Sequence, residues 1–431
     1  MAVKEKILIL SYCFPPSNLT PSERSLSWAK YLKDGNYYPI IITRNWDIEI
    51  KNASSDMFKS SGTDIRIEKH DDYEVHYLPY KASIKDKIFT KTIGTKFYFF
   101  YLISAFFFSI LNLLYLKTTS YFNFFSYSVQ LLKQTPEIKK MVVTVSPFEL
   151  LGIAHLINRS TGIQWIADYR DDWSTSELYK KNIGKKFLNI FNSFYEKKWT
   201  RSATYFISVS NYYVEKIEKH IHKKGFLLTN GYMPENYSIQ YPLYEEFTIT
   251  YVGSIYESQP IELFLEGAKR FINMHNDELK IKLLFIGVLN EHKVVDRILK
   301  ASTGIEKYIS FTDRVPKKQA IEMQSKSHLL LVCSHRYLKG IPGSKLYEYI
   351  ALKKNIIVYP SDGDIIEETL SQTKQGLFCS NQDDLLKHLN YQYNKYLKIN
   401  NSDESEFDES EILKYSRMSQ TKVLIDVLNK I

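Results

Sequence analysis

Residues 340–359 read GIPGSKLYEYIALKKNIIVY and join a glycine-containing turn to a short helix and then to an apolar strand. A helix that begins at about Ser344 presents unpaired backbone N–H groups and the positive end of its dipole, which together favour an anion such as phosphate. One turn later, Glu348 faces the same side and suits the hydroxyls of a ribose. The same residues also fit an ordinary strand–helix–strand unit with an exposed lysine and glutamate, so the rest of the sequence must decide between this unit and a phosphate site.

The length and composition fit a folded chain of two domains. A chain of 431 residues is too long for one ordinary core and suits two domains of about 200 residues each. Hydrophobic residues make up 44% of the chain and charged residues 24%, values that disfavour disorder. The formal charge of +9 favours an anionic partner: nucleic acid, an acidic membrane face or a phosphorylated substrate. Because the basic residues are spread out and form no recognisable module, no nucleic-acid partner is expected.

The cysteines and the first residues favour a cytoplasmic protein. Cys13, Cys333 and Cys379 lie far apart and match no metal or redox spacing, which fits a reducing compartment. The chain begins MAVKEKILILSY, and its apolar run is too short for a signal peptide. We interpret this run as a first buried strand.

Short apolar runs alternate with helical stretches, a pattern typical of α/β proteins with parallel sheets and crossover helices. The first series of predicted strands covers residues 6–10, 39–43, 74–78, 141–145, 164–168 and 205–209. The second covers residues 248–252, 281–286, 308–311, 328–333 and 355–359. The turn signal Asn230–Gly231 lies between them, so we predict Rossmann-like domains over 1–232 and 233–405. A ligand is expected in a cleft where the carboxyl ends of both sets of strands meet.

The last residues read as a linker and a helix. The run DESEFDESE, residues 403–411, contains six acids and is interpreted as a solvated linker and helix start. A helix from Ser410 to Asn429 follows, so the segment 406–431 is predicted to pack back on the first domain.

An aromatic segment, residues 88–132, interrupts the pattern of the first domain. Its centre, FYFFYLISAFFFSILNLLYL (residues 97–116), has no charge and is flanked by Lys85, Lys87, Lys91, Lys96 and Lys117. Its length is near that of a membrane span, but a span would place parts of one predicted sheet on opposite sides of the bilayer. The aromatic residues and flanking lysines favour helices that lie in the interface of an anionic membrane. Buried or partner-contacting helices remain the alternative.

Several motifs in order resemble the bacterial family-4 retaining glycosyltransferases of the GT-B fold, in their surface-polysaccharide branch. These are ILILSYCFPPSNLTPSERSLSWAKYL at the start, VSPFELLGIAHLI, IQWIADYRDDW, LLTNGY at the hinge, ITYVGSIY with Gly253, and GIPGSKLYEYIALKKNIIVY. The resemblance covers nearly the whole chain. It implies a GT-B architecture, a central cleft and transfer of a sugar from a nucleotide-sugar donor to an acceptor hydroxyl with retention. The acceptor would be lipid-linked or an oligosaccharide, on the inner face of the cytoplasmic membrane.

The resemblance also implies which residues bind the donor. The second glutamate of the family's Glu-x7-Glu motif matches Glu348, and its backbone amides match Ser344 and Lys345 after Gly343. Gly340 stands where the family has the first glutamate, so another group must orient the sugar, with His335 or Arg336 as candidates. The resemblance implies no metal and no cofactor.

Charge complementarity selects the same region without the resemblance. A departing nucleoside diphosphate develops negative charge, so transfer needs positioned donors and cations. Lys345, Arg336 and Arg314 are the cationic candidates. An exposed lysine at a helix start and an arginine on a loop surface are the alternatives for Lys345 and Arg314. Arg24, at the start of the first helix, is a further candidate for contact with phosphate.

The acceptor side is expected in the first domain. Asp168, Arg170, Asp171 and Asp172 follow a predicted strand, and four charges in five residues would be costly inside a core. We predict Asp171, with Arg170 and Asp168, as catalytic residues. Alternatively, Arg170 pairs with one aspartate and only shapes the loop.

Other chemistries have less support. Asp362-Gly363-Asp364 resembles an Asp-x-Asp metal motif, but it lies in a turn where these residues are common. Walker, Gly-x-Gly-x-x-Gly and Gly-x-Ser-x-Gly motifs are absent from the sequence, which disfavours nucleotide hydrolysis, dinucleotide redox chemistry and ester hydrolysis. Two alternatives stay open: a nucleotide-sugar epimerase of the same fold, and a non-catalytic interaction protein on a transferase scaffold.

Overall fold

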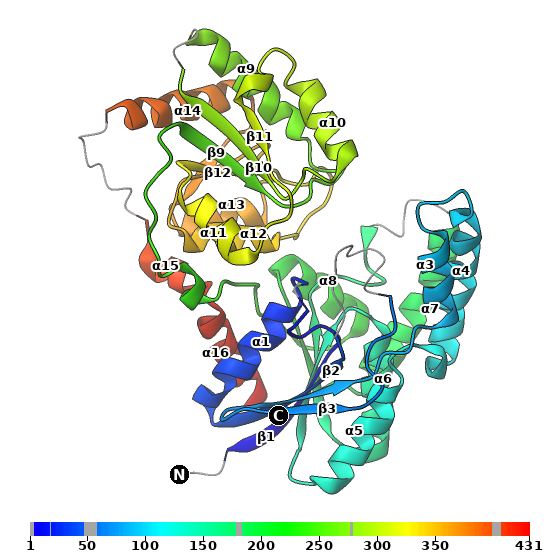
Figure 1. Cartoon of the computed structure of the whole chain (residues 1–431). Coiled ribbons are helices and arrows are strands. Elements are labelled where there is room, and N and C mark those ends of the chain that lie inside the picture. The colour runs from blue at the N-terminus through cyan, green and yellow to red at the C-terminus, as the bar shows by residue number, and fades with distance from the viewer. Residues whose placement is uncertain (1–3, 18, 47–57, 178–182, 276–278, 399–406) are drawn as a thin grey trace. The chain divides into compact units, whose positions relative to one another are not determined.

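The chain forms two compact α/β units in a computed structural model (Figure 1). The structure describes residues 4–17, 19–46, 58–177, 183–275, 279–398 and 407–431. Unit 1 consists of Met1–Thr229 and Gln420–Ile431, and unit 2 of Asn230–Ser419. The division therefore falls between Thr229 and Asn230, within the LLTNGY segment.

Unit 1 is built on an eight-stranded sheet in the order β3-β4-β2-β1-β5-β6-β7-β8. Its strands are β1 (Glu5–Ser11), β2 (Tyr37–Arg44), β3 (Arg66–Lys69), β4 (Glu74–Leu78), β5 (Lys140–Val145), β6 (Gln164–Tyr169), β7 (Tyr205–Ser208) and β8 (Gly225–Leu227). All neighbours pair in parallel except β3, which runs antiparallel to β4 at the edge. The order reverses between β1 and β5, so the loops after these strands flank the crevice of this sheet.

Helices cover both faces of this sheet. They are α1 (Ser22–Tyr31), α3 (Ile84–Thr92), α4 (Tyr98–Leu114), α5 (Asn123–Gln134), α6 (Glu149–Thr161), α7 (Ile183–Thr200), α8 (Asn211–Ile221) and α16 (Arg417–Leu428). One core contains Ile7, Ile9 and Trp28 of β1 and α1 together with Leu424 and Leu428 of α16. The last helix therefore completes the core of unit 1, and apolar residues on both faces of the strands explain their continuous hydrophobic runs.

Unit 2 contains a six-stranded parallel sheet in the order β11-β10-β9-β12-β13-β14. Its strands are β9 (Phe247–Val252), β10 (Ile281–Ile286), β11 (Ile309–Phe311), β12 (Leu329–Val332), β13 (Ile356–Val358) and β14 (Gly376–Phe378). This is the Rossmann order, in which the direction of chain progression reverses between β9 and β12.

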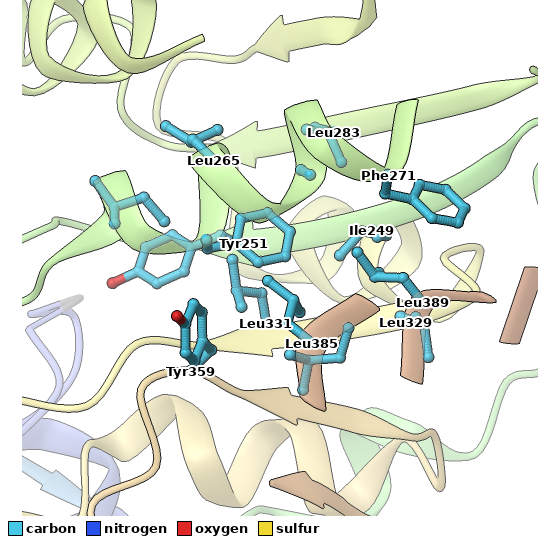
Figure 2. Close-up of a cluster of buried hydrophobic side chains, with 14 of the residues drawn as sticks. Ile249, Tyr251, Leu265, Phe271, Leu283, Leu329, Leu331, Tyr359, Leu385 and Leu389 are labelled. Atoms are coloured by element: carbon cyan, nitrogen blue, oxygen red, sulfur yellow. The ribbon is translucent and has the colours of Figure 1, made fainter. Parts of the chain in front are cut away.

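The helices of unit 2 are α9 (Ile261–Met274), α10 (His292–Ala301), α11 (Lys317–Ser325), α12 (Ser344–Ala351), α13 (Ile365–Gln372), α14 (Gln382–Leu397) and α15 (Glu409–Lys414). Figure 2 shows the core on one face of the sheet, where Ile249 and Leu331 of the strands meet Leu265 of α9 and Leu385 of α14. On the other face, α12 and α13 pack against β12 and β13. The sheet is thus covered on both sides, and α12 follows β12 directly in the chain.

The eleven strands expected from the sequence all form, with ends that differ by up to two residues. The short strands β3, β8 and β14 were not predicted. The C-terminal helix expected from Ser410 to Asn429 is instead two helices, α15 and α16, separated at Tyr415 and Ser416. The backbone N–H of Tyr232 donates to the carbonyl of Tyr415, and that of Arg417 donates to the carbonyl of Tyr232. These bonds replace helical ones and interrupt the helix. Residues 403–406 of the acidic run lie outside the described residues.

The uncharged centre of the aromatic segment forms α4, whose side chains are exposed or half-buried except for one. Leu113 is the buried residue of this helix, whereas Phe99 and Phe107 have exposed fractions of 63% and 66%. The alternative of a buried helix is therefore wrong. Within the described parts of the chain, no helix is both long and apolar enough to cross a membrane.

Candidate functional site

Gly253 ends β9 at the point where the strand order of unit 2 reverses. Its φ of +91° is a conformation that favours glycine, and its N–H donates to the carbonyl of Ile286 at 2.9 Å. A Cβ built on Gly253 would lie 3.6 Å from Cε of Lys345, so the strand end and the start of α12 lie close together. A glycine here leaves backbone accessible to a ligand at the reversal point, where sheets of this order bind nucleotides.

Near the start of α12, Glu348 lies between two lysines. Nζ of Lys345 lies 3.1 Å from Oε2 of Glu348, and Nζ of Lys317, at the start of α11, lies 3.7 Å from Oε1. The Glu348 side chain is largely buried, whereas Lys345 is half exposed. Lys345 and Glu348 stand at i and i+3 on one helix face, which explains their contact. Lys317 was not predicted, because it belongs to a helix about 30 residues earlier in the chain.

The α12 N-terminus suits an anion. Gly343 precedes the helix with extended backbone angles, and Ser344 and Lys345 are its first two residues. The first N–H groups of a helix have no partner within it, and its dipole places positive charge there. Two lysines reinforce this charge, and the buried carboxylate beside them accepts hydroxyl or amine donors. The arrangement fits a ligand that carries both phosphate and hydroxyl groups.

Arg314 lies near this region. It follows β11 and is exposed, and a Cβ built on Gly287, at the end of β10, would lie 4.0 Å from its Cγ. Gly253, Gly287 and Arg314 thus follow three neighbouring strands, β9, β10 and β11, and lie at the carboxyl ends of these strands.

His335 and Arg336 follow β12 and are held by the loop after β9. Nδ1 of His335 lies 2.7 Å from Oγ of Ser258, and the N–H of Arg336 donates to the carbonyl of Ser258 at 2.7 Å. Burial lowers the pKa of His335, which favours a neutral ring. The Arg336 side chain is exposed. Gly340, at φ +71°, donates its N–H to the Asp364 carboxylate, so an acidic residue from another loop contacts the backbone at the position of the missing glutamate.

Asp362 caps α13. Its carboxylate accepts hydrogen bonds from the N–H groups of Asp364, Ile366 and Glu367 at 3.0–3.1 Å. This bonding explains an Asp-Gly-Asp sequence by helix capping. In the described ranges, no group of three or more His, Cys, Asp or Glu side chains is arranged to hold a metal ion.

Arg24 and Asp168 form a buried ion pair in unit 1. Both side chains are at most 1% exposed, and Nη2 of Arg24 lies 2.7 Å from Oδ1 of Asp168 while Nε donates to the same carboxylate. The guanidinium also donates to the carbonyls of Leu228 and Thr229 at 3.0 Å. These contacts correct two predictions: Arg24 is buried and bonded within the protein, which leaves it unsuited to bind phosphate, and Asp168 is bonded to it, which leaves it unsuited to act on a substrate.

The remaining charged residues after β6 are more accessible. Asp171 is exposed, and Asp172 is paired with Lys216 of α8 at 2.8 Å. Nε of Arg170 donates to the carbonyl of Val145 at 3.1 Å, which ties this loop to the end of β5. Desolvation of the carboxylate raises the pKa of Asp171, Arg170 lowers it, and the negative charges of Asp172 and Asp168 raise it further. Asp171 and Arg170 thus remain the acceptor-side candidates.

A buried glutamate that sequence reasoning missed supports this loop. Oε2 of Glu196, on α7, accepts the N–H of Ser174 at 3.1 Å and lies 3.7 Å from Nε2 of His220. Burial raises the pKa of Glu196 to about 7 and lowers that of His220 to about 4. Glu196 occurs within EKKW, where a surface helix is the natural interpretation, so the sequence offered no signal for its burial.

Comparison with known protein families finds a match in the second half of the chain. Residues 235–405 match the model of the family described as "Glycosyl transferases group 1". This range contains every candidate of the α12 site. No curated protein sequence matches the chain.

Several solved structures share the whole two-unit fold. A glycosyltransferase from Rickettsia africae is 13% identical with a TM-score of 0.61, and 98% of this chain and 97% of that chain are covered. Sucrose-phosphate synthase from Thermosynechococcus elongatus is 11% identical with a TM-score of 0.65, covering 99% and 100%. Anabaena HepE in complex with UDP-glucose is 9% identical with a TM-score of 0.60, covering 99% and 100%. These likenesses show that the chain has the GT-B fold.

Proposed function

We propose that this protein transfers a sugar from a nucleotide-sugar donor to an acceptor hydroxyl with retention of anomeric configuration. The observation that carries the proposal is the position of Glu348, held between Lys345 and Lys317 one turn after the start of α12. This site lies within the region that matches the glycosyltransferase family. Retention follows the sequence resemblance to the retaining branch.

The donor's diphosphate would lie at the α12 N-terminus. There the backbone N–H groups of Ser344 and Lys345 and the two lysines stabilise the negative charge that develops as the nucleoside diphosphate departs. Glu348 would accept hydrogen bonds from the ribose, and Arg314 would add positive charge from the end of β11. Because these groups supply fixed positive charge to the leaving group, we propose that transfer needs no metal ion.

We propose a lipid-linked or oligosaccharide acceptor that reacts near Asp171 and Arg170 in unit 1. A cleft of about 900 Å³ in this unit supports an amphiphilic acceptor. Lys81, Lys85 and Lys87 line it together with apolar residues such as Phe108 and Leu111 of α4. Lysines beside an apolar wall suit a phosphate that is joined to a hydrocarbon chain.

We further propose a role in cell-surface polysaccharide synthesis on the inner face of the cytoplasmic membrane. The exposed aromatic residues of α4 and the lysines before it support this location. The role in polysaccharide synthesis follows the sequence resemblance.

Ligand-induced thermal stabilisation tests the donor site. Uridine, guanosine and cytidine diphosphates are screened first, and a ligand at about 100 times its dissociation constant adds about 2.7 kcal/mol of stability. The Glu348→Ala variant should lose both this stabilisation and sugar transfer from the matching nucleotide sugar. Glu322→Ala is the matched control, because Glu322 of α11 pairs at 2.6 Å with Lys326, the residue that follows this helix.

The outcomes separate the candidate functions. Full transfer activity in Glu348→Ala would contradict the site assignment. Tight nucleotide-sugar binding with no dependence on an acceptor would favour an epimerase. Failure of every nucleoside diphosphate to stabilise the wild-type protein would favour a non-catalytic interaction protein.

A further inference from the structure

The helix α7 carries an exposed apolar stripe on a different part of the chain from α4. Ile183, Phe187, Ile190 and Phe194 stand at positions i, i+4, i+7 and i+11, so they share one face of the helix. Their exposed fractions range from 49% to 86%. A stripe with this spacing normally faces a core, yet here the structure leaves it uncovered.

The two exposed helices touch. In Figure 1, α3, α4 and α7 lie side by side on unit 1, and α4 contacts both of the others. The rings of Phe106 on α4 and Phe187 on α7 stack with centroids 6.2 Å apart. Phe187 therefore joins the α7 stripe to α4, whose exposed aliphatic and phenylalanine residues are Phe99, Phe100, Leu102, Ile103, Phe107 and Leu114. We call these ten residues the α4–α7 face.

The exposed charges carried by α3, α4 and α7 themselves are of one sign. The carboxylates of α3, α4 and α7 are Asp86 and Glu196, and both are buried. Asp86 caps α3 through Ser83, and Glu196 supports the loop after β6. The lysines of these helices, by contrast, reach solvent: Lys85, Lys87, Lys91, Lys185, Lys186, Lys197 and Lys198. An apolar face whose surrounding exposed charge is positive complements a bilayer with anionic lipid headgroups.

We propose that the α4–α7 face inserts into the interface of an anionic lipid bilayer, with both helices lying in the membrane plane. The face is too extensive for the scattered apolar residues of an ordinary soluble surface. The proposal deepens the membrane location proposed above by adding α7, and it predicts lipid contact from two segments about 85 residues apart.

Vesicle sedimentation of the full-length protein tests the proposal. The wild type should bind vesicles of phosphatidylcholine with phosphatidylglycerol, and more weakly at high salt. The variant Phe187→Ser/Ile190→Ser/Phe194→Ser should bind these vesicles at least about tenfold more weakly, because three inserted side chains are lost. The matched control Met274→Ser/Leu289→Ser/Leu299→Ser changes three exposed apolar residues of unit 2 and should bind like the wild type.

Charge and insertion are measured separately. Lys87→Gln/Lys91→Gln should weaken binding to the mixed vesicles by about fivefold for each lysine. A polarity-sensitive dye on Ile190→Cys should show a blue shift on adding vesicles, whereas the same dye on Leu289→Cys should not. The native cysteines, Cys13, Cys333 and Cys379, are buried, which favours labelling at the introduced thiol.

Three results would overturn the proposal: unchanged vesicle binding by the α7 variant, an unshifted dye at residue 190, or a stable dimer without lipid that the α7 variant dissociates. Thermal stabilisation of the wild type by a nucleoside diphosphate tests the donor site independently, so failure of the membrane proposal can be told apart from failure of the proposed function. The α7 variant should retain that stabilisation, because its substitutions lie in unit 1 and the candidate donor residues lie in unit 2.

Discussion

Removing one partner of the Arg24–Asp168 pair should destabilise unit 1 strongly. In Arg24→Met, a carboxylate with no exposed surface loses its cation. In Asp168→Asn, the guanidinium keeps only the carbonyls of Leu228 and Thr229 as strong acceptors. Breaking a buried ion pair in this way costs about 3–5 kcal/mol. For a unit of this size, the loss corresponds to about 6–20 °C in melting temperature.

The double variant Arg24→Met/Asp168→Leu separates the charge term from the other contacts. Replacing both partners by apolar side chains leaves no uncompensated charge, and the remaining cost is that of the two carbonyls that lose their donor, about 1–3 kcal/mol each. We expect the double variant to be less destabilised than the sum of Arg24→Met and Asp168→Leu measured singly, because the two residues interact directly.

Differential scanning calorimetry and urea titration of the four proteins provide the assay. A loss below about 1 kcal/mol in Arg24→Met would refute the reasoning, since a value that small is typical of an exposed pair. A stable Asp168→Asn protein without sugar transfer would also refute it and restore a catalytic role for Asp168.

Three further predictions follow from single contacts. Gly231→Ala should lower the free energy of unfolding by about 1–3 kcal/mol, because its Cβ would lie 2.4 Å from the Tyr415 carbonyl oxygen. Gly343→Ala is the control and should cost little stability, since no atom lies within 4 Å of its Cβ. Equal losses of stability in the two variants would contradict this reasoning. The pKa of Glu196 is raised to about 7 in the folded protein, so wild-type stability should fall as the pH rises from the pKa of an unfolded glutamate through 7. Glu196→Gln should remove up to about 3 kcal/mol of this decline. Equal dependence of the melting temperature on pH in the two proteins would contradict this prediction. Lys345→Met should weaken nucleoside diphosphate binding by about tenfold in calorimetric titration, since a charge-assisted contact is lost, and unchanged affinity would exclude a phosphate contact.

The strands were predictable because their apolar runs are buried on both faces of a sheet. The runs at Ile281–Ile286 and Glu74–Leu78 became strands with those ends. The strands that were missed, β3, β8 and β14, have three or four residues and stand at or beside sheet edges, where few apolar residues are needed. Local pattern carries too little information at that length.

The α12 site was predictable in part because its members are close in sequence. Lys345 and Glu348 lie one helical turn apart, so their contact follows from helix geometry. Lys317 reaches the site from another helix, and Arg24 meets Asp168 across 144 residues. Such contacts depend on the tertiary fold. The stripe on α7 has clear spacing, but spacing alone does not distinguish a core face from an exposed one.

The position of the last helix has a consequence for synthesis of the protein. Leu424, Val427 and Leu428 lie in the core of unit 1, and the hydroxyl of Tyr37 donates to the side chain of Asn429. A ribosome makes these residues only after the whole of unit 2. The unit that is translated first therefore completes its core after the second unit has been made, and part of its apolar surface stays uncovered until then. Removing the residues from Gln420 onward would thus damage the unit at the other end of the chain.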